Sequence, residues 1–123
     1  MRKIKISTQG VEREAELNNS PMADALWKAL PIKGKANRWG DEIYFRIKVE
    51  YVPGEMKEVV EEGDIAFWPP GSAFCIFFGP TPVSTESQIR PASEVAVLGR
   101  IKGDLKPFKS VKDGDEIFIE KAE

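Results

Sequence analysis

Hydrophobic and polar residues alternate along the first part of the chain. Residues 2–8 and 11–17 each show the period of two that is typical of a strand with one buried face. Gln9 and Gly10 lie between them and form a two-residue hairpin signal. We therefore expect the two segments to pair as antiparallel strands.

The period changes to that of a helix after residue 19. Apolar residues recur at four-residue spacing from Met22 to Leu30, which predicts one helix over residues 21–30. Ser20 suits the N-cap because its hydroxyl can accept a backbone N–H bond, and Pro21 suits the first turn. A second proline directly after the helix is expected to end it.

Short segments with strand character fill the rest of the chain. Residues 31–42 are rich in Gly, Asn and Lys and predict a loop, whereas residues 43–52 (IYFRIKVEYV) alternate apolar and polar positions. One face of this strand is expected to be buried, while the other is wet or lines a site. Further strands are predicted at residues 57–60, 64–68, 73–78, 95–101 and 116–121.

One local phrase, Val-x-x-Gly-Asp-x-x-Phe, occurs at residues 60–67 and again at residues 111–118. Its glycine can supply a positive φ for a turn, and its aspartate can accept bonds from nearby backbone N–H groups. We interpret the phrase as shared turn chemistry, with a true internal repeat as the alternative.

These elements predict a mainly β protein. About eight short strands and one main helix fit a closed or nearly closed β-barrel, because closure removes the exposed strand edges that could pair with other chains. A length of 123 residues fits one domain around one core. Residues 1–123 are therefore expected to form a single domain.

The charge pattern argues against nucleic acid as a partner. The chain has 18 Lys and Arg against 20 Asp and Glu, and the two signs are interleaved rather than gathered into a basic stripe. No apolar run approaches the ~20 residues of a membrane-spanning helix, and the first ten residues are typical of a strand rather than a signal peptide. The single cysteine, Cys75, can form no internal disulfide. We expect a cytoplasmic protein that binds neither nucleic acid nor membrane.

The composition also excludes several kinds of catalytic site. The chain has no histidine, so Ser-His-Asp and Cys-His mechanisms and histidine zinc sites are unavailable. It has neither a Gly-x-Gly-x-x-Gly nor a Gly-x-x-x-x-Gly-Lys-Ser/Thr motif for a nucleotide. Cys75 lies within FCIFF, where burial would raise its pKa, and is expected to be a small buried hydrophobe. We predict no metal and no cofactor.

Residues 63–82 (GDIAFWPPGSAFCIFFGPTP) concentrate aromatic residues and prolines. Ile65 and Phe67 share one face of the strand before the turn, whereas residues 73–78 after it are apolar on both faces. A barrel interior accepts only one of these faces. The other is expected to be covered by the helix or the chain ends, or to form the floor of an apolar groove.

A ligand site also needs polar groups, because pockets combine apolar walls with a few placed polar side chains. Residues 37–45 (NRWGDEIYF) and 81–95 (TPVSTESQIRPASEV) can supply them. We predict a binding module for a small molecule or a peptide, with a structural role as the alternative for each candidate residue. The candidate ligand-binding residues are Arg38, Trp39, Glu42, Tyr44, Trp68, Phe78, Pro82 and Arg90.

Three phrases resemble a family of small prokaryotic proteins with a cyclophilin-like fold: RWGDEIYF at 38–45, GDIAFWPPGSAFCIFFGPTP at 63–82 and RPASEVAVLGRI at 90–101. They have the family's order and spacing, and the resemblance covers essentially the whole chain. It implies a cyclophilin-like β-barrel of about eight strands with helical segments closing its ends. The family has long been a domain of unknown function, so the resemblance implies no particular reaction.

Cyclophilins themselves isomerise X-Pro bonds with an arginine that hydrogen-bonds the prolyl nitrogen. Phe45-Arg46-Ile47 resembles part of their Phe-His-Arg-Ile/Val phrase, which makes Arg46 the candidate catalytic residue beside Arg38 and Arg90. The histidine and the Phe-Met-x-Gln-Gly-Gly-Asp phrase that follows it are missing. An atypical prolyl isomerase is therefore the alternative to a binding module. Self-association of the apolar face, as a homodimer, is the third hypothesis.

Overall fold

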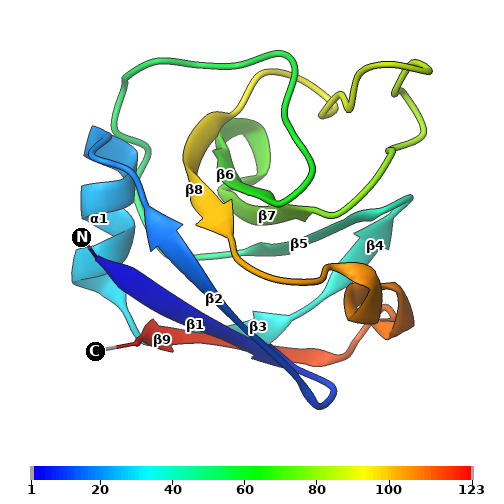
Figure 1. Ribbon diagram of the computed structural model, residues 1–123. Coiled ribbons are helices and arrows are strands. Elements are labelled where there is room, and N and C mark those ends of the chain that lie inside the picture. The colour runs from blue at the N-terminus through cyan, green and yellow to red at the C-terminus, as the bar shows by residue number, and fades with distance from the viewer. Residues whose placement is uncertain (1, 123) are drawn as a thin grey trace.

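The strands of the protein form one sheet that curves round on itself (Figure 1). The computed structural model describes residues 2–122. Neighbouring strands pair in the order β3-β9-β1-β2-β8-β6-β7-β5-β4, and every pairing is antiparallel. The bounds are β1 Lys3–Thr8, β2 Val11–Leu17, β3 Ile32–Lys35, β4 Asn37–Trp39, β5 Glu42–Arg46, β6 Asp64–Trp68, β7 Ala73–Phe77, β8 Ala96–Ile101 and β9 Glu116–Lys121.

The two edge strands, β3 and β4, follow one another in the chain, which brings the edges of the sheet together. Ala36 alone separates them and is buried. Gly34 of β3 lies so close to β5 that an added Cβ would be 2.5 Å from a ring carbon of Phe45. The nine strands therefore make a nearly closed barrel, which confirms the predicted mainly β fold.

Three predicted boundaries were wrong. Residues 31–42 were expected to be a loop but contain β3 and β4. β3 pairs with β9, which is distant in sequence, and β4 pairs with β5. The Gly and Asn residues of this segment hid its strand character. Residues 57–60 make only two isolated bridges, Lys57 to Val95 and Val60 to Ile89. The strand predicted over 43–52 ends at Arg46.

The predicted hairpin and helix are confirmed. β1 pairs with β2 around Gln9 and Gly10, which both have positive φ. Helix α1 spans Pro21–Ala29, and the Ser20 hydroxyl accepts a hydrogen bond from the backbone N–H of Ala23 at 3.2 Å. Figure 1 shows α1 beside the two chain ends. The helix buries Met22, Ala23 and Leu26 in the main core.

The repeated Gly-Asp phrase forms the same turn twice, as predicted. In each copy the aspartate side chain accepts a hydrogen bond from the backbone N–H three residues earlier, at 2.8 Å for both Asp64 and Asp115. In each copy the aspartate N–H donates back to the carbonyl of that same residue at 3.0 Å. Gly63 and Gly114 have φ of 96° and 92°. The likeness is thus fully explained by local turn chemistry.

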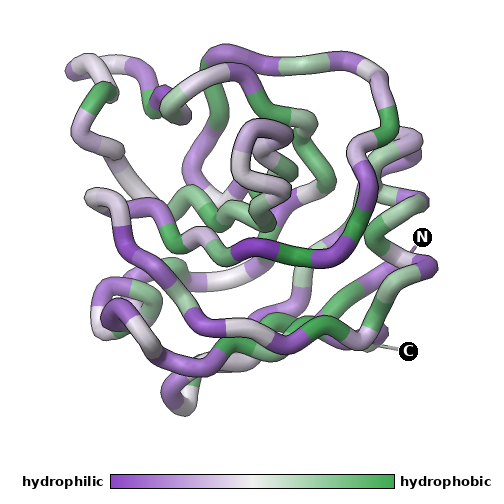
Figure 2. The backbone as a smooth tube through the Cα atoms, turned by 180° about the vertical axis from the view of Figure 1, so that it is seen from behind, coloured by the Kyte–Doolittle hydropathy of each residue, from purple (hydrophilic) through white to green (hydrophobic). Residues whose placement is uncertain are grey.

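Hydrophobic side chains form two clusters rather than one. The main core fills the barrel and includes Ile65, Phe67 and Phe74. A second cluster lies on the opposite, outer face of the β6–β7 hairpin. In the rear view of Figure 2 hydrophobic and polar stretches alternate along the tube, and polar stretches interrupt the long connections. The buried members of the second cluster are Val60, Ala66, Ala73, Cys75, Phe77 and Val95.

Candidate functional site

A pocket of about 290 Å³ opens on the outer face of the β6–β7 hairpin, beside the second hydrophobic cluster. We call it the outer pocket. The strands supply its aromatic and acidic lining, and a loop after β7 supplies the rest. Its lining residues are Trp39, Glu42, Tyr44, Trp68, Pro91, Ala92 and Val95.

Strand register brings the first three lining residues together. Trp39 of β4 lies directly opposite Glu42 of β5. Glu42 and Tyr44 are two residues apart on β5, so their side chains leave the same face of the sheet. Tyr44 pairs with Cys75 of β7, which continues this face into the second cluster.

Trp68 ends β6 and connects the barrel to the loop that covers it. Its indole N–H donates a hydrogen bond to the hydroxyl of Ser93 at 2.7 Å. An added Cβ on Gly71 would lie 2.8 Å from the Trp68 ring, so the turn after β6 packs against the indole. The ring is therefore held in place, with one side left facing the pocket.

The covering loop, residues 79–95, is held in shape by hydrogen bonds among its own residues and with the segment at residues 57–60. The Thr81 hydroxyl donates to the Arg90 carbonyl. The backbone N–H of Thr81 and that of Arg90 both donate to the Ser84 hydroxyl. Val95 exchanges two backbone bonds with Lys57, at 2.8 and 2.9 Å. The pocket is thus preformed by ordered backbone.

The start of this loop also packs against the β4–β5 turn. The Asp41 N–H donates to the Pro80 carbonyl at 2.9 Å, and the Phe78 N–H donates to the Asp41 carbonyl at 3.0 Å. Gly40 has a φ of 61°, and an added Cβ would lie 2.8 Å from a ring carbon of Pro82. The turn that presents Trp39 and Glu42 therefore depends on a glycine at position 40.

We expect Gly40→Ala to lower the free energy of unfolding by about 2 kcal/mol or more, because it adds a steric clash to the strain of a positive φ. Gly10→Ala is the matched control, since Gly10 also has positive φ (75°) and has open space where its Cβ would lie. It should cost only about 1 kcal/mol. Urea unfolding of both variants measures the difference, and equal losses would show that the packing of Gly40 against residues 80–82 contributes nothing.

Glu42 is the charged residue of the pocket lining. Its residue surface is only 6% exposed. Burial raises the pKa of its carboxyl to about 7, and a hydrogen bond with the Cys75 thiol opposes the rise. Burial and the nearby Glu42 charge raise the pKa of Cys75 well above its ordinary range, so this buried thiol is inert, as predicted. Among residues 2–122, no Lys or Arg makes an ion pair with Glu42.

Four of the eight predicted binding residues line the outer pocket, namely Trp39, Glu42, Tyr44 and Trp68. The other four lie elsewhere. Phe78 is 3% exposed and belongs to the main core. Pro82 packs against Gly40, and the Arg90 guanidinium donates to the Gln88 side chain. Arg38 has a structural role that is described next. Whether the pocket residues bind a ligand stays a prediction.

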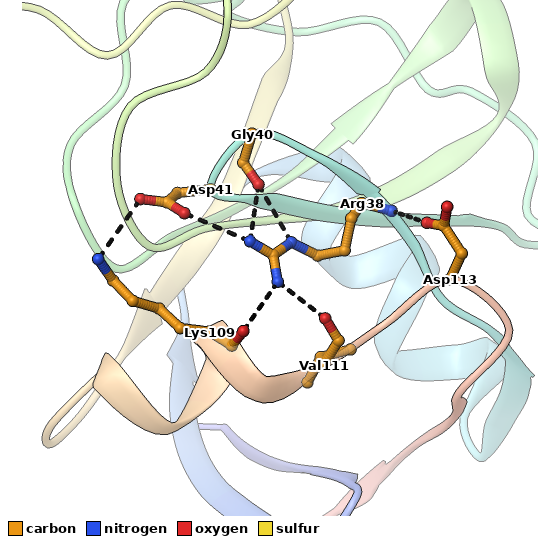
Figure 3. Close-up of polar contacts among 6 residues, drawn as sticks. All are labelled: Arg38, Gly40, Asp41, Lys109, Val111 and Asp113. Carbon is orange, nitrogen blue, oxygen red and sulfur yellow. Dashed lines mark hydrogen bonds and ion pairs between the residues drawn. The ribbon is translucent and has the colours of Figure 1, made fainter.

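Arg38 is the strand neighbour of Trp39, so its side chain leaves the opposite face of β4. It ties the β4–β5 turn to the segment around Lys109 and Val111 (Figure 3). Its guanidinium donates to the carbonyls of Gly40, Lys109 and Val111 and contacts the Asp41 carboxylate at 3.3 Å. The guanidinium carbon also lies 4.9 Å from the centre of the Phe78 ring. The side chain links the β4–β5 turn to the 3-10 helix at Lys106–Ser110.

The candidate catalytic residue, Arg46, is exposed at the end of β5. It lines a separate depression with residues of α1 and β3, including Ala29 and Lys33. Another depression, of about 710 Å³, lies at the β1–β2 turn and is open, with mixed polar and apolar lining. Neither combines aromatic side chains with a buried charge, so the outer pocket is the better candidate despite its smaller volume.

Sequence reasoning missed three lining residues and one neighbour. Pro91, Ala92 and Val95 lie within residues 81–95, the segment that was expected to supply polar groups to the site, but no local signal distinguished them. Cys75 was predicted to be buried and is, yet its contact with Glu42 depends on the β5–β7 pairing. Within residues 2–122, no cluster of acidic and Cys side chains could hold a metal ion, and no helix is long and apolar enough to span a membrane.

Comparison with known proteins extends these findings. The chain is similar to the hypothetical protein AF2241 from Archaeoglobus fulgidus, whose solution structure has a TM-score of 0.83 at 46% identity, over 98% of this chain and 95% of that one. It also matches the structure of McbB in complex with tryptophan, with a TM-score of 0.70 at 18% identity, over 97% of this chain and 44% of that one. The second likeness shows the fold alone. No curated protein matches the chain. The model of a family described as "Cyclophilin-like" matches residues 2–120. The chain belongs to this cyclophilin-like family.

Proposed function

We propose that the protein is a binding module that holds a small molecule, or one side chain of a peptide, in the outer pocket. One observation carries the proposal. The outer face of the β6–β7 hairpin is apolar, and the 79–95 loop covers it without filling the space between Trp39, Tyr44 and Trp68. Such a preformed apolar hollow with a few placed polar groups is typical of ligand sites.

The surroundings of the pocket favour a small guest over a second protein chain. Most of the second cluster is sealed by residues 57–60 and by the 79–95 loop of the same chain. The large exposed hydrophobic residues among those described are Tyr51 and Val83, which lie outside the pocket lining. An interface between copies would need a broader apolar surface. The isomerase alternative gains no support, because Arg46 lines a different depression.

The three tryptophans allow a direct test by NMR. Trp39 and Trp68 line the pocket, whereas Trp27 lies on α1 between Arg2 and Lys121. Titration with a library of small fragments should shift the indole N–H signals of Trp39 and Trp68 and leave that of Trp27 unchanged. Trp27 thus serves as the internal control.

A pocket-filling variant completes the test. Ala92→Phe places a large side chain at the pocket opening and should abolish the fragment-induced shifts, because residue 92 is exposed and its replacement leaves the core intact. Ala29→Phe, at an equally exposed alanine on α1, should leave them unchanged. Failure of any fragment to shift Trp39 and Trp68 selectively, or shifts that survive Ala92→Phe, would contradict the proposal.

A further inference from the structure

We propose that the outer pocket recognises an organic cation, specifically a methylated ammonium group, which lies against the three aromatic rings and neutralises Glu42. This inference rests on the proposed binding function and names the chemical class of the ligand. Among residues 2–122, no Lys or Arg makes an ion pair with this carboxylate. The argument follows from the aromatic lining, the unpaired carboxylate and the size of the pocket.

The aromatic lining supplies the first part of the recognition. Trp39, Tyr44 and Trp68 come from three different strands and border one small hollow. The faces of aromatic rings carry partial negative charge and attract cations, most strongly where water is excluded. Methylated ammonium groups suit such a site, because their charge is spread over carbon and needs no hydrogen-bond acceptor for each methyl group.

Glu42 supplies the second part. It is more than nine-tenths buried, and the Cys75 thiol, which donates to the Ala73 carbonyl at 3.8 Å, is the neighbour that opposes the rise in its pKa. The two arginines among the predicted binding residues make other hydrogen bonds. Arg38 donates to carbonyls on the far side of β4, and Arg90 donates to the Gln88 side chain. A buried carboxylate normally has a partner, so an incoming cation would fill an open position.

The volume of the pocket limits the guest. About 290 Å³ lies at the lower end of the roughly 300–1,000 Å³ that is usual for small-molecule sites. The indole N–H of Trp68 already donates to Ser93, which leaves Glu42, the Tyr44 hydroxyl and the Trp39 indole N–H as the polar groups of the lining side chains. A guest with several hydrogen-bonding groups would find few partners, whereas a trimethylammonium group needs only the charge and the rings.

Protonation of Glu42 should couple this recognition to pH. The groups that face its carboxyl are the Cys75 thiol from β7, the Tyr44 phenol on β5 and the uncharged Trp39 ring on β4. Because the pKa of Glu42 is raised to about 7, the carboxyl is largely neutral at pH 6 and largely ionised at pH 8. A cation should therefore bind more tightly at pH 8.

The experiment compares choline with 3,3-dimethyl-1-butanol, which has the same shape and no charge. Binding is followed at pH 6 and pH 8 through the indole signals of Trp39 and Trp68. At pH 8 choline should bind at least about tenfold more tightly than the neutral analogue. This preference should shrink at pH 6, and Glu42→Gln should remove most of it while the neutral analogue still binds.

The outcomes separate this inference from the proposed function. Equal or tighter binding of the neutral analogue would overturn the cation inference and leave the pocket as an apolar binding site. Absence of binding by both probes would also overturn it, while the fragment titration decides the proposed function independently. A short peptide with one trimethyllysine distinguishes two sources of the group. If the trimethyllysine peptide binds more tightly than choline, the natural ligand is a peptide. If it binds more weakly than choline, the natural ligand is a free metabolite.

Discussion

Replacing Arg38 with methionine is expected to lower the free energy of unfolding by about 3 kcal/mol, the largest effect that we predict for a single side chain outside the apolar core. The guanidinium satisfies carbonyls of Gly40, Lys109 and Val111 that lie on two separate segments (Figure 3). Methionine keeps much of the apolar contact with Phe78 but donates no hydrogen bond. The partly buried bond to the Val111 carbonyl and the more exposed bonds to Gly40 and Lys109 would then be lost at once.

Arg100→Met is the matched control, because Arg100 also bonds a carboxylate and a carbonyl but on the surface. Its side chain is 54% exposed, compared with 23% for Arg38. Water can replace those bonds, so the control should cost about 1 kcal/mol or less. Urea unfolding of the three proteins measures both effects. Arg38→Lys should recover little, since an ammonium cannot reach several carbonyls in a fork. Equal losses for Arg38→Met and Arg100→Met would contradict a structural role for Arg38.

Glu42→Gln is expected to stabilise the protein at pH 8 and to change little at pH 4. The folded-state pKa of Glu42 is about 7, against an ordinary value of 4.5. Between these values the folded protein holds a proton that the unfolded chain has lost, so rising pH lowers the stability of the wild type. The glutamine side chain does not ionise, so the variant does not lose stability in this way as the pH rises. The difference between variant and wild type should reach about 3 kcal/mol at pH 8.

Urea unfolding at pH 4, 6 and 8 measures this difference. Asp64, whose pKa burial also raises, is present in both proteins and cancels in the comparison. Glu16→Gln is a control of opposite sign, because a hydrogen bond with Lys102 lowers the pKa of Glu16. That variant should lose stability relative to wild type above the ordinary pKa of a glutamate. A Glu42→Gln effect that is the same at all three pH values would show that Glu42 is not desolvated.

Local sequence signals were sufficient for the elements that depend on neighbouring residues. The Gln9-Gly10 turn, the Ser20 cap and both Gly-Asp turns satisfy their own backbone groups within a few positions. β3 is different, because Gly34 and two lysines give it little strand propensity and β9, about eighty residues later, supplies its partner. Such pairing cannot be deduced from local pattern.

The candidate site was predicted in part for the same reason. Alternation along residues 43–52 placed Tyr44 on the face away from the core correctly, whereas Glu42 was assigned to the preceding loop although it begins β5. Residues 37–39 were treated as a loop, so alternation was not applied there, and Arg38 was grouped with Trp39 although neighbouring strand residues point to opposite faces. The loop positions of Arg90 and Pro82 depend on contacts with Gln88 and Gly40 that no periodicity reveals.

The central claim is that the apolar outer face of the β6–β7 hairpin borders an accessible hollow instead of being sealed. A crystal structure of the wild-type protein under xenon pressure tests it most directly, because xenon enters apolar cavities without needing a specific contact. We expect xenon density between the rings of Trp39, Tyr44 and Trp68. A Trp68 ring folded down onto Cys75, with no xenon beside Glu42, would contradict the claim.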